Sequence, residues 1–288
     1  MITFLKYKLI YITISGVVII SGLVAILAGG LRFSIDFTGG SLLQYKFGRT
    51  VRSAEIQNIF SKTNTKILTI DQSEKNTFII RTVPVSEAKE TEIRKKIENN
   101  LKTSVTSLRV ETVGPTLGRE TVNKTLIASF VAILGILLYL TVVFKRLNFG
   151  FSAVLAMIHD LAVLVGTYAI LGLFFNAEVD TLFVTALLTT LSFSVHDTIV
   201  VFDKIREYRR LTSLPLEVMA NKAITETMVR SVNNSLTIVL MLVPLVLFGG
   251  ETIRFFAASL LIGTITGTYS SPFVATPILV FLEEHRHR

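Results

Sequence analysis

The chain has 288 residues, a formal charge of +8 and no cysteine, and half of its residues are apolar. The mean hydropathy of +0.60 excludes an ordinary soluble enzyme and indicates a membrane protein. The lack of cysteine excludes disulfides, zinc–thiolate sites and cysteine nucleophiles. Much of the positive charge flanks apolar runs, where membrane topology accounts for it, so nucleic acid is not predicted as a partner.

The first apolar run extends from Leu9 to Leu31, after a short basic segment that contains Lys6 and Lys8. A secretory signal has an apolar core of only about 7–15 residues, whereas this run is long enough to span a bilayer. The segment Ala25–Ala28 could accommodate a cleavage site, but we interpret residues 1–31 as an uncleaved transmembrane helix whose N-terminus is cytoplasmic.

Residues 32–124 are polar and show the periodicities of a soluble domain. Their order of elements, β-α-β-β-α-β, predicts an α+β ferredoxin-like fold outside the cytoplasm. No group of acidic, histidine or serine side chains resembles a catalytic site, so we expect a module that binds a partner or moves as a lever. The predicted strands are 41–47, 65–70, 77–83 and 104–113, the helices are 51–62 and 86–101, and residues 71–76 form a hairpin turn.

Residues 125–288 contain five more apolar spans, which with the first predict a polytopic protein with six transmembrane helices. The segment 203–230 between the fourth and fifth spans is basic and amphipathic. It is predicted to be a cytoplasmic helix on the membrane surface, interrupted at Pro215. The five spans are 125–144, 149–175, 181–202, 231–248 and 254–282.

Lysine and arginine predict the orientation of this bundle. If six spans alternate, almost all basic residues near the spans fall on one side, and Arg254 alone falls in the short links of the other side. Both termini are therefore expected in the cytoplasm. The residues on that side are Lys6, Lys8, Lys145, Arg146, Lys204, Arg206, Arg209, Arg210, Lys222, Arg230, Arg286 and Arg288.

The fourth span carries an acid at membrane depth, Asp197. An ionisable group costs a few kcal/mol there, so such residues usually have a function, although a helix-end role in the headgroup region is the alternative. Thr190, Ser194 and Thr198 lie three or four residues from one another or from Asp197 and so share its helix face, which is expected to point inward. For these hydroxyls we favour a structural role in helix contacts.

Arg230, at the start of the fifth span, is predicted to lie at the depth of Asp197, with Asn233 near enough to hydrogen-bond. An arginine beside an aspartate favours the ionised carboxylate, and separating them favours protonation, so such a pair would work as a proton switch. His159 and Asp160 in the third span form a second intramembrane pair, either structural or proton-carrying. His196 is a pH-sensitive neighbour, because histidine changes charge near neutral pH.

Three segments resemble the SecF family, the accessory subunits of the bacterial Sec translocase within the RND transporter superfamily. They are Asp36-Phe37-Thr38-Gly39-Gly40 after the first span, Val113-Gly114-Pro115 with Gly118 and Glu120 before the second, and the run SVHDTIVVFDKIRE at 194–207. The resemblance covers essentially the whole chain. It also includes the six spans, half of the usual RND set, and the large first loop.

The resemblance implies a protein translocase subunit of the bacterial inner membrane that uses the proton motive force to help export unfolded polypeptides. It implies SecD as an obligate partner, the SecYEG channel, YajC or YidC as further partners, and surrounding membrane lipid. It makes Asp197 the proton-coupling acid and Arg230 its basic partner, and it matches His159-Asp160 to a family pair. Family members often carry Asn where this chain has His196. The segments with Asp36, Gly39 and Gly40 and with Gly114 and Pro115 would position the external domain.

Two alternatives stay open: an RND-type exporter of small molecules or lipids, and a scaffold of the translocon without coupling of its own. The sequence contains no G-x-x-x-x-G-K-[ST] motif, so ATP-driven transport by this chain is not predicted. No cofactor, metal site or enzymatic activity is predicted.

Overall fold

The computed structural model describes residues 3–63 and 65–285, with the side chains of residues 74, 251, 252 and 285 excepted. Two compact units are present. One is Phe33–Leu126, and the other, the membrane unit, is formed by the chain on both sides of that segment. Within the described residues, six helices are long and apolar enough to cross a membrane, and all of them contribute to the membrane unit.

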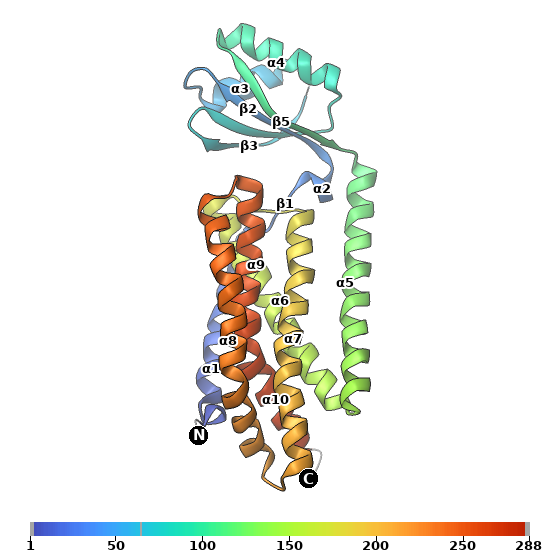
Figure 1. Ribbon diagram of the computed structural model, residues 1–288. Helices are drawn as coiled ribbons and strands as arrows, with labels where there is room; N and C mark the ends of the chain where they lie inside the picture. Colours follow the sequence, from blue (N-terminus) through green and yellow to red (C-terminus); the bar gives the residue numbers. More distant parts are fainter. Residues whose placement is uncertain (1–2, 64, 286–288) are drawn as a thin grey trace. The chain divides into compact units, whose positions relative to one another are not determined.

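The membrane unit begins with a 3-10 turn, η1 (Phe4–Tyr7), that leads into α1. The sixth span is a composite, because α9 continues through the π-helical turn η2 into α10. The helices are α1 (Lys8–Leu27), α5 (Pro115–Phe144), α6 (Leu147–Phe175), α7 (Thr181–Leu211), α8 (Leu216–Phe248), α9 (Glu251–Ser270), η2 (Ser271–Ala275) and α10 (Thr276–His285) (Figure 1). Two residues, Glu178–Val179, form the short strand β6 between α6 and α7.

Glycines allow the helices of this unit to approach closely. A Cβ atom on Gly22 of α1 would lie 2.5 Å from the Cα of Gly166 of α6, so the two backbones touch at this point. A Cβ on Gly263 of α9 would lie 2.1 Å from the Thr190 side chain of α7. Small residues are the usual means by which transmembrane helices pack, because no hydrophobic force draws them together in lipid.

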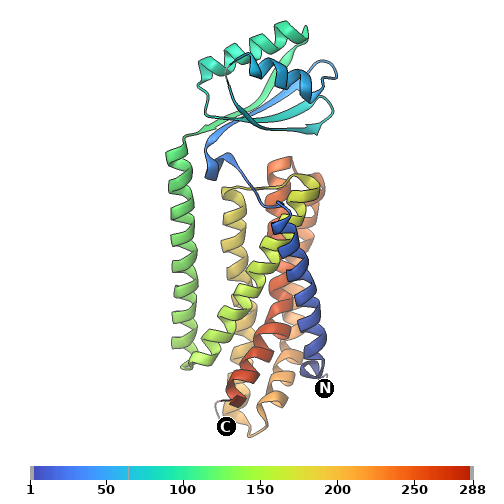
Figure 2. The ribbon, with the colours of Figure 1, turned by 180° about the vertical axis from the view of Figure 1, so that it is seen from behind.

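The chain termini, the α5–α6 connection and the α7–α8 link lie at one end of the membrane unit (Figures 1 and 2). The α6–α7 and α8–α9 connections lie at the other end. Except for Arg230, which lies in the middle of α8, the described basic residues that predict the orientation belong to the helix ends and links of the first end. Arg286 and Arg288, which were predicted to share that side, lie outside the described residues.

Two predictions for the spans differ from the structure. Residues 203–230 do not form a separate surface helix: they are the end of α7 and the start of α8, joined by a link at 212–215. α5 starts at Pro115, ten residues before the predicted span, because proline suits the first turn of a helix. The predicted sixth span agrees with the apolar helix Ile253–Glu284, within which the π turn η2 contains Pro272, a residue without a backbone N–H to donate.

The second unit has the order β2 (Gly40–Phe47), α3 (Ser53–Ser61), β3 (Ile67–Glu74), β4 (Thr77–Thr82), α4 (Glu87–Leu101) and β5 (Val105–Val113). The sheet order is β3-β4-β2-β5, and every neighbouring pair is antiparallel. α3 and α4 cover one face of the sheet (Figures 1 and 2). The core between them contains Tyr45, Phe47, Phe60, Phe78, Ile80, Ile93 and Ile97.

The predicted turn at 71–76 is too long. β3 continues to Glu74, and the hairpin turn consists of Lys75 and Asn76. Asn76 has a φ of 63°, a left-handed conformation that asparagine adopts more readily than most residues. Polar side chains on an exposed strand therefore resembled a loop in the sequence.

A tight corner joins the two glycine motifs of the second unit. The strand β1 (Arg32–Phe33) leads into the short helix α2 (Ile35–Thr38), which is followed by Gly39 and Gly40. The φ angles of these two residues, 70° and 130°, favour glycine. A Cβ on Gly118 of α5 would lie 2.8 Å from the carbonyl oxygen of Phe37. A Cβ on Gly39 would lie 2.7 Å from the Cα of Pro115. The two motifs thus form one backbone contact.

Candidate functional site

A layer of buried polar side chains crosses the middle of the membrane unit. In an apolar environment each polar group must find a partner, so such a layer is either a structural network or a path for ions. Its members come from α1, α6, α7, α8, α9 and η2. They are Ser15, His159, Asp160, Thr190, Ser194, Asp197, Thr198, Ser231, Tyr269, Ser270 and Ser271.

Asp160 of α6 is the centre of this layer, and only 6% of its surface is exposed. One carboxylate oxygen, Oδ2, accepts hydrogen bonds from Ser194 of α7 at 2.5 Å and from Ser270 of α9 at 2.6 Å. The other oxygen, Oδ1, lies 2.9 Å from Nδ1 of His159. Three side chains from three helices therefore hold both oxygens of this acid.

His159 extends the network to α1. Its Nε2 atom lies 2.9 Å from the hydroxyl of Ser15, which also lies 3.4 Å from the Tyr269 hydroxyl. The Tyr269 hydroxyl donates to the carbonyl of Tyr11 at 2.9 Å. Because Tyr269 donates its proton to Tyr11 and Ser15 donates its proton to Tyr269, Nε2 of His159 is the donor in its bond to Ser15.

The turn η2 brings a second pair of hydroxyls to α7. Ser271 and Thr198 lie 2.9 Å apart, and Ser271 is also 3.3 Å from the carbonyl oxygen of Ser194. Gly267, one turn earlier in α9, allows this approach, because its Cβ would lie 3.0 Å from the Cα of Ser194. Single π turns in helices occur often at functional sites. Here the turn places Ser270 and Ser271 on the acid layer.

Asp197 has a different environment from Asp160. It is equally buried, with 6% of its surface exposed, and the hydroxyl of Ser231 of α8 interacts with its carboxylate. No direct hydrogen bond connects Asp197 to Asp160 in the part of the chain that the structure describes. Asp197 therefore depends on one hydroxyl, whereas Asp160 has three partners.

Arg230 and His196 are the charged or chargeable side chains that act on Asp197 electrostatically. No ion pair within 4.0 Å joins Arg230 to Asp197 among the described residues, so the two are neighbours without a salt bridge. His196, Arg230 and Asn233 are all exposed on the surface of α7 and α8. Ser192 and Asn234 of the same two helices are also exposed. Together these residues form an exposed polar face on α7 and α8.

The structure buries the whole predicted stripe of α7, namely Thr190, Ser194, Asp197 and Thr198. Sequence reasoning missed the partners that come from other helices: Ser15, Ser231, Tyr269, Ser270 and Ser271. A signal for three of these was present, because the run TGTYSSP at 266–272 is unusually polar for the middle of a span. Ser15 and Ser231 are single serines and give no such signal.

The chemistry of this layer is that of proton binding and hydrogen bonding. Within residues 3–63 and 65–285 no group of three or more His, Cys, Asp or Glu side chains could hold a metal ion. Carboxylates, an imidazole and hydroxyls in contact can accept and pass protons, and buried ionisable groups in membranes often do so.

Comparison with known proteins gives matches over nearly the whole chain. The family model "Protein export membrane protein SecD/SecF, C-terminal" matches residues 93–285, and the "SecD/SecF GG Motif" model matches residues 24–51. The protein translocase subunit SecF of Thermobaculum terrenum is 40% identical, over 98% of this chain and 94% of that protein. The same subunit of Anaerolinea thermophila is 36% identical, over 100% of this chain and 96% of that protein.

Two solved structures share the fold. The crystal structure of SecDF from Thermus thermophilus, a translocon-associated membrane protein, has a TM-score of 0.85 at 30% identity over 98% of this chain. SecDF in a super-membrane-facing form has a TM-score of 0.70 at 31% identity over 99% of this chain. The chain spans 39% of the length of each of these SecDF chains.

Proposed function

The chain belongs to the SecF family of protein translocase subunits, and from that membership we propose that it couples proton movement through its membrane unit to the export of polypeptides. It is an integral inner-membrane protein. The proposed cargo is unfolded chain that emerges from the SecYEG channel, with YajC or YidC as further neighbours. The orientation supported by the basic residues has both termini in the cytoplasm.

The observation that carries the proposal is the contrast between the two buried acids. Asp160 has three hydrogen-bond partners, which suit a fixed structural element. Asp197 has the single hydroxyl of Ser231, with Arg230 and His196 next to it on an exposed polar face. An acid with few fixed partners beside an accessible face is the better candidate for reversible protonation, so we assign the coupling role to Asp197.

Protonation of Asp197 would change the contact between α7 and α8. The ionised carboxylate attracts the Arg230 guanidinium, and this attraction is strong where water is scarce. A proton on Asp197 removes the charge and the attraction, so the two helices would be free to shift. We propose that His196, His159 and Asp160 modulate the protonation of Asp197. The polar side chains that would support this site are Asn233, Thr190, Ser194 and Thr198.

We propose that SecD covers the open polar face of α7 and α8. His196, Arg230 and Asn233 lie exposed on segments that cross the membrane, and such groups normally face protein or a water-filled path. In SecDF from Thermus, the part that matches this chain is 39% of a longer chain. We propose that the rest of such a chain lies over this polar face. SecD supplied as a separate chain would complete the layer here.

The external unit is proposed to be a ferredoxin-like module that moves with the membrane helices. Its strand order and antiparallel pairing support that class. The corner at Asp36, Gly39, Gly40, Gly114 and Pro115 is the proposed hinge. Two solved SecDF structures match this chain over 98% and 99% of its length with TM-scores of 0.85 and 0.70.

The experiment that tests the proposal measures export of a secretory protein into inverted membrane vesicles that contain this chain and SecD. Wild type is compared with Asp197→Asn, with and without a proton gradient. The gradient should accelerate export with wild type and not with the variant, while both assemble with SecD. A non-coupling scaffold predicts equal export by the two proteins. A small-molecule or lipid exporter predicts that export of polypeptides is independent of this chain.

A further inference from the structure

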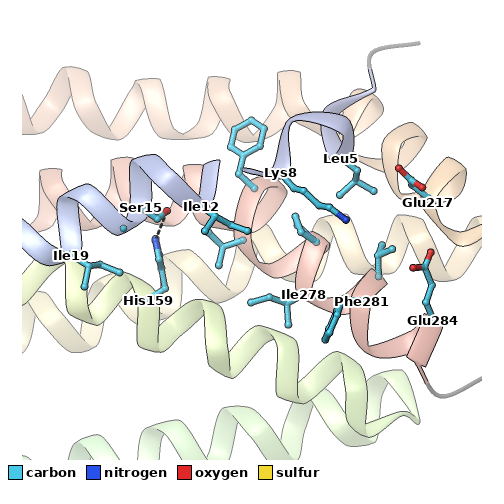
Figure 3. A pocket seen from close by; sticks show the side chains of 15 residues that line it. Leu5, Lys8, Ile12, Ser15, Ile19, His159, Glu217, Ile278, Phe281 and Glu284 are labelled. Carbon is cyan, nitrogen blue, oxygen red and sulfur yellow. Dashed lines mark hydrogen bonds between the residues drawn. The ribbon is translucent and has the colours of Figure 1, made fainter. Parts of the chain in front are cut away.

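A cavity of about 620 Å³ lies between α1 and the segment formed by η2 and α10 (Figure 3). Its walls are apolar, with Ile12 and Ile19 of α1 on one side and Phe273 and Ile278 on the other. His159 of α6 and Ser15 line its inner end, where they hydrogen-bond to each other (Figure 3). Their polar atoms are thus already partnered, and an apolar occupant meets no unsatisfied group from this pair.

The length of the cavity corresponds to one leaflet of a bilayer. Lys8 and Ile19, at its two ends on α1, are eleven residues apart, or roughly 16 Å at 1.5 Å per residue. On the opposite wall the lining residues extend from Phe273, which packs against Tyr11, to Glu284. Half of a hydrocarbon core of about 30 Å is about 15 Å. Along α1 the cavity is therefore about as long as the hydrocarbon layer of one leaflet.

The mouth of the cavity carries three charged side chains from three different elements. Lys8 of α1 points toward the space between Glu217 of α8 and Glu284 of α10 (Figure 3). Among the described residues no ion pair within 4.0 Å involves any of the three. One cation and two anions around an apolar slot suit a headgroup that itself carries both charges.

We propose that this cavity binds one aminophospholipid, with an acyl chain in the slot and an ethanolamine headgroup at the mouth. The phosphate would pair with Lys8, and the primary ammonium, with three N–H donors, would bind Glu217 and Glu284. An anionic glycerol headgroup has no cation for the two carboxylates, and choline has no N–H to donate. Because the walls are apolar, water is a poor occupant. The proposal does not depend on proton coupling.

The bound chain would seal His159 from the lipid side. Each buried methylene contributes about 0.8 kcal/mol, so even part of an acyl chain supplies substantial affinity. The network from Ser15 to Asp160 would then lie behind a lipid plug, and protons would reach the acid layer from elsewhere. The lipid would also bridge α1 to α8 and α10 at the N-terminal end of the bundle.

Two sets of variants test the site. Gly16 lines the cavity, and a Cβ there would have no atom within 4 Å, so Gly16→Leu fills the slot without a backbone clash. Gly135→Leu is the matched control, because Gly135 in α5 is equally open and lies outside the cavity. The pair Glu217→Gln and Glu284→Gln removes both anions from the mouth and leaves the slot intact.

The measurement is native mass spectrometry of the full chain in detergent, titrated with dioleoyl phosphatidylethanolamine, phosphatidylglycerol or phosphatidylcholine. Wild type and Gly135→Leu should retain one phosphatidylethanolamine, roughly fivefold tighter than phosphatidylglycerol, as expected for exposed ion pairs of about 1 kcal/mol. Gly16→Leu should bind it roughly tenfold more weakly, because about two methylenes are displaced. The double glutamine variant should prefer phosphatidylglycerol.

The proposal is overturned if wild type retains no lipid at this stoichiometry, which would also be the result for a water-filled slot or one reserved for a protein segment. It is equally overturned if Gly16→Leu binds as wild type does. Loss of binding by Gly16→Leu with no headgroup preference in wild type would overturn the aminophospholipid assignment. The glutamine pair keeps the test valid should Gly16→Leu fold poorly.

Discussion

The carboxylate of Asp160 on α6 accepts a hydrogen bond of 2.5 Å from the hydroxyl of Ser194 on α7. Three residues further along α7, Asp197 belongs to the same buried layer, where the hydroxyl of Ser231 interacts with it. One helix thus carries both a fixed contact to the first acid and the second acid itself. A shift of α7 relative to α6 would therefore alter the surroundings of both acids together.

Ser270→Ala should lower stability, because the hydroxyl is fully buried and donates to Asp160 at 2.6 Å. A buried hydrogen bond to a carboxyl group contributes about 1.5–3 kcal/mol to the free energy of unfolding. Thermal unfolding of the purified protein in detergent measures the loss. Ser192→Ala, at an exposed position of α7, is the control. Equal melting temperatures for the two variants would show that Asp160 does not need Ser270.

Gly166→Leu should disrupt the packing of α1 against α6. The backbone of Gly22 lies against Gly166, so a side chain at this position must push the helices apart. Overpacking of this kind costs about 1–3 kcal/mol. Limited proteolysis near the N-terminus and thermal unfolding would report the loss. Gly135→Leu, where a Cβ meets nothing within 4 Å, should be as stable as wild type. Similar loss in both variants would count against a specific α1–α6 contact.

Gly118→Val should disturb the corner between the glycine motifs, whereas Gly114→Ala should be tolerated. A Cβ on Gly118 would lie 2.8 Å from the Phe37 carbonyl oxygen, but one on Gly114 would meet nothing within 4 Å. Both residues belong to the same motif. A difference between the two variants would therefore show that the close backbone contact at Gly118 matters, and not the motif as a whole. Export assays and cross-linking between the segments would measure the effect. Full activity of Gly118→Val would remove the corner from the proposed hinge.

Tyr45 in the second unit should give the protein a stability that disappears in alkali. Burial, together with its hydrogen bond to Glu90 at 2.8 Å, raises the pKa of the Tyr45 phenol above its ordinary value. A folded-state pKa above the unfolded value stabilises the fold below about pH 10 and loses that effect as the pH rises further. Tyr45→Phe should flatten the fall in melting temperature above pH 10. An unchanged slope in that variant would place the alkaline loss elsewhere.

The elements of this fold followed from periodicity and composition, but their ends did not. Apolar runs reveal the spans, yet α7 and α8 extend far beyond them, because helical hydrogen bonds continue into water where the sequence turns polar. β3 extends through polar residues that resembled a turn. The π turn η2 contains Pro272, and the sequence gives no sign that the helix adopts a π turn there.

The candidate site was predicted in part. Asp197 and Asp160 stand out because acids are rare at membrane depth. The serines that bind them do not, since serine is common in transmembrane helices and its partner depends on how the helices pack. Sequence alone suggests an ion pair between Asp197 and Arg230. The described residues show none within 4.0 Å, and Ser231, next to Arg230, also interacts with the carboxylate.

The most direct test of the coupling role of Asp197 is proton flux in vesicles that hold this chain with SecD. Wild type is compared with Asp197→Asn and with Thr185→Ala, an exposed position near the start of α7, as the control for a change on the same helix. We expect wild type and Thr185→Ala to conduct protons during export, and Asp197→Asn to fall to the level of empty vesicles although the complex assembles. Undiminished flux through an assembled Asp197→Asn complex would contradict the account and reduce this acid to a structural residue.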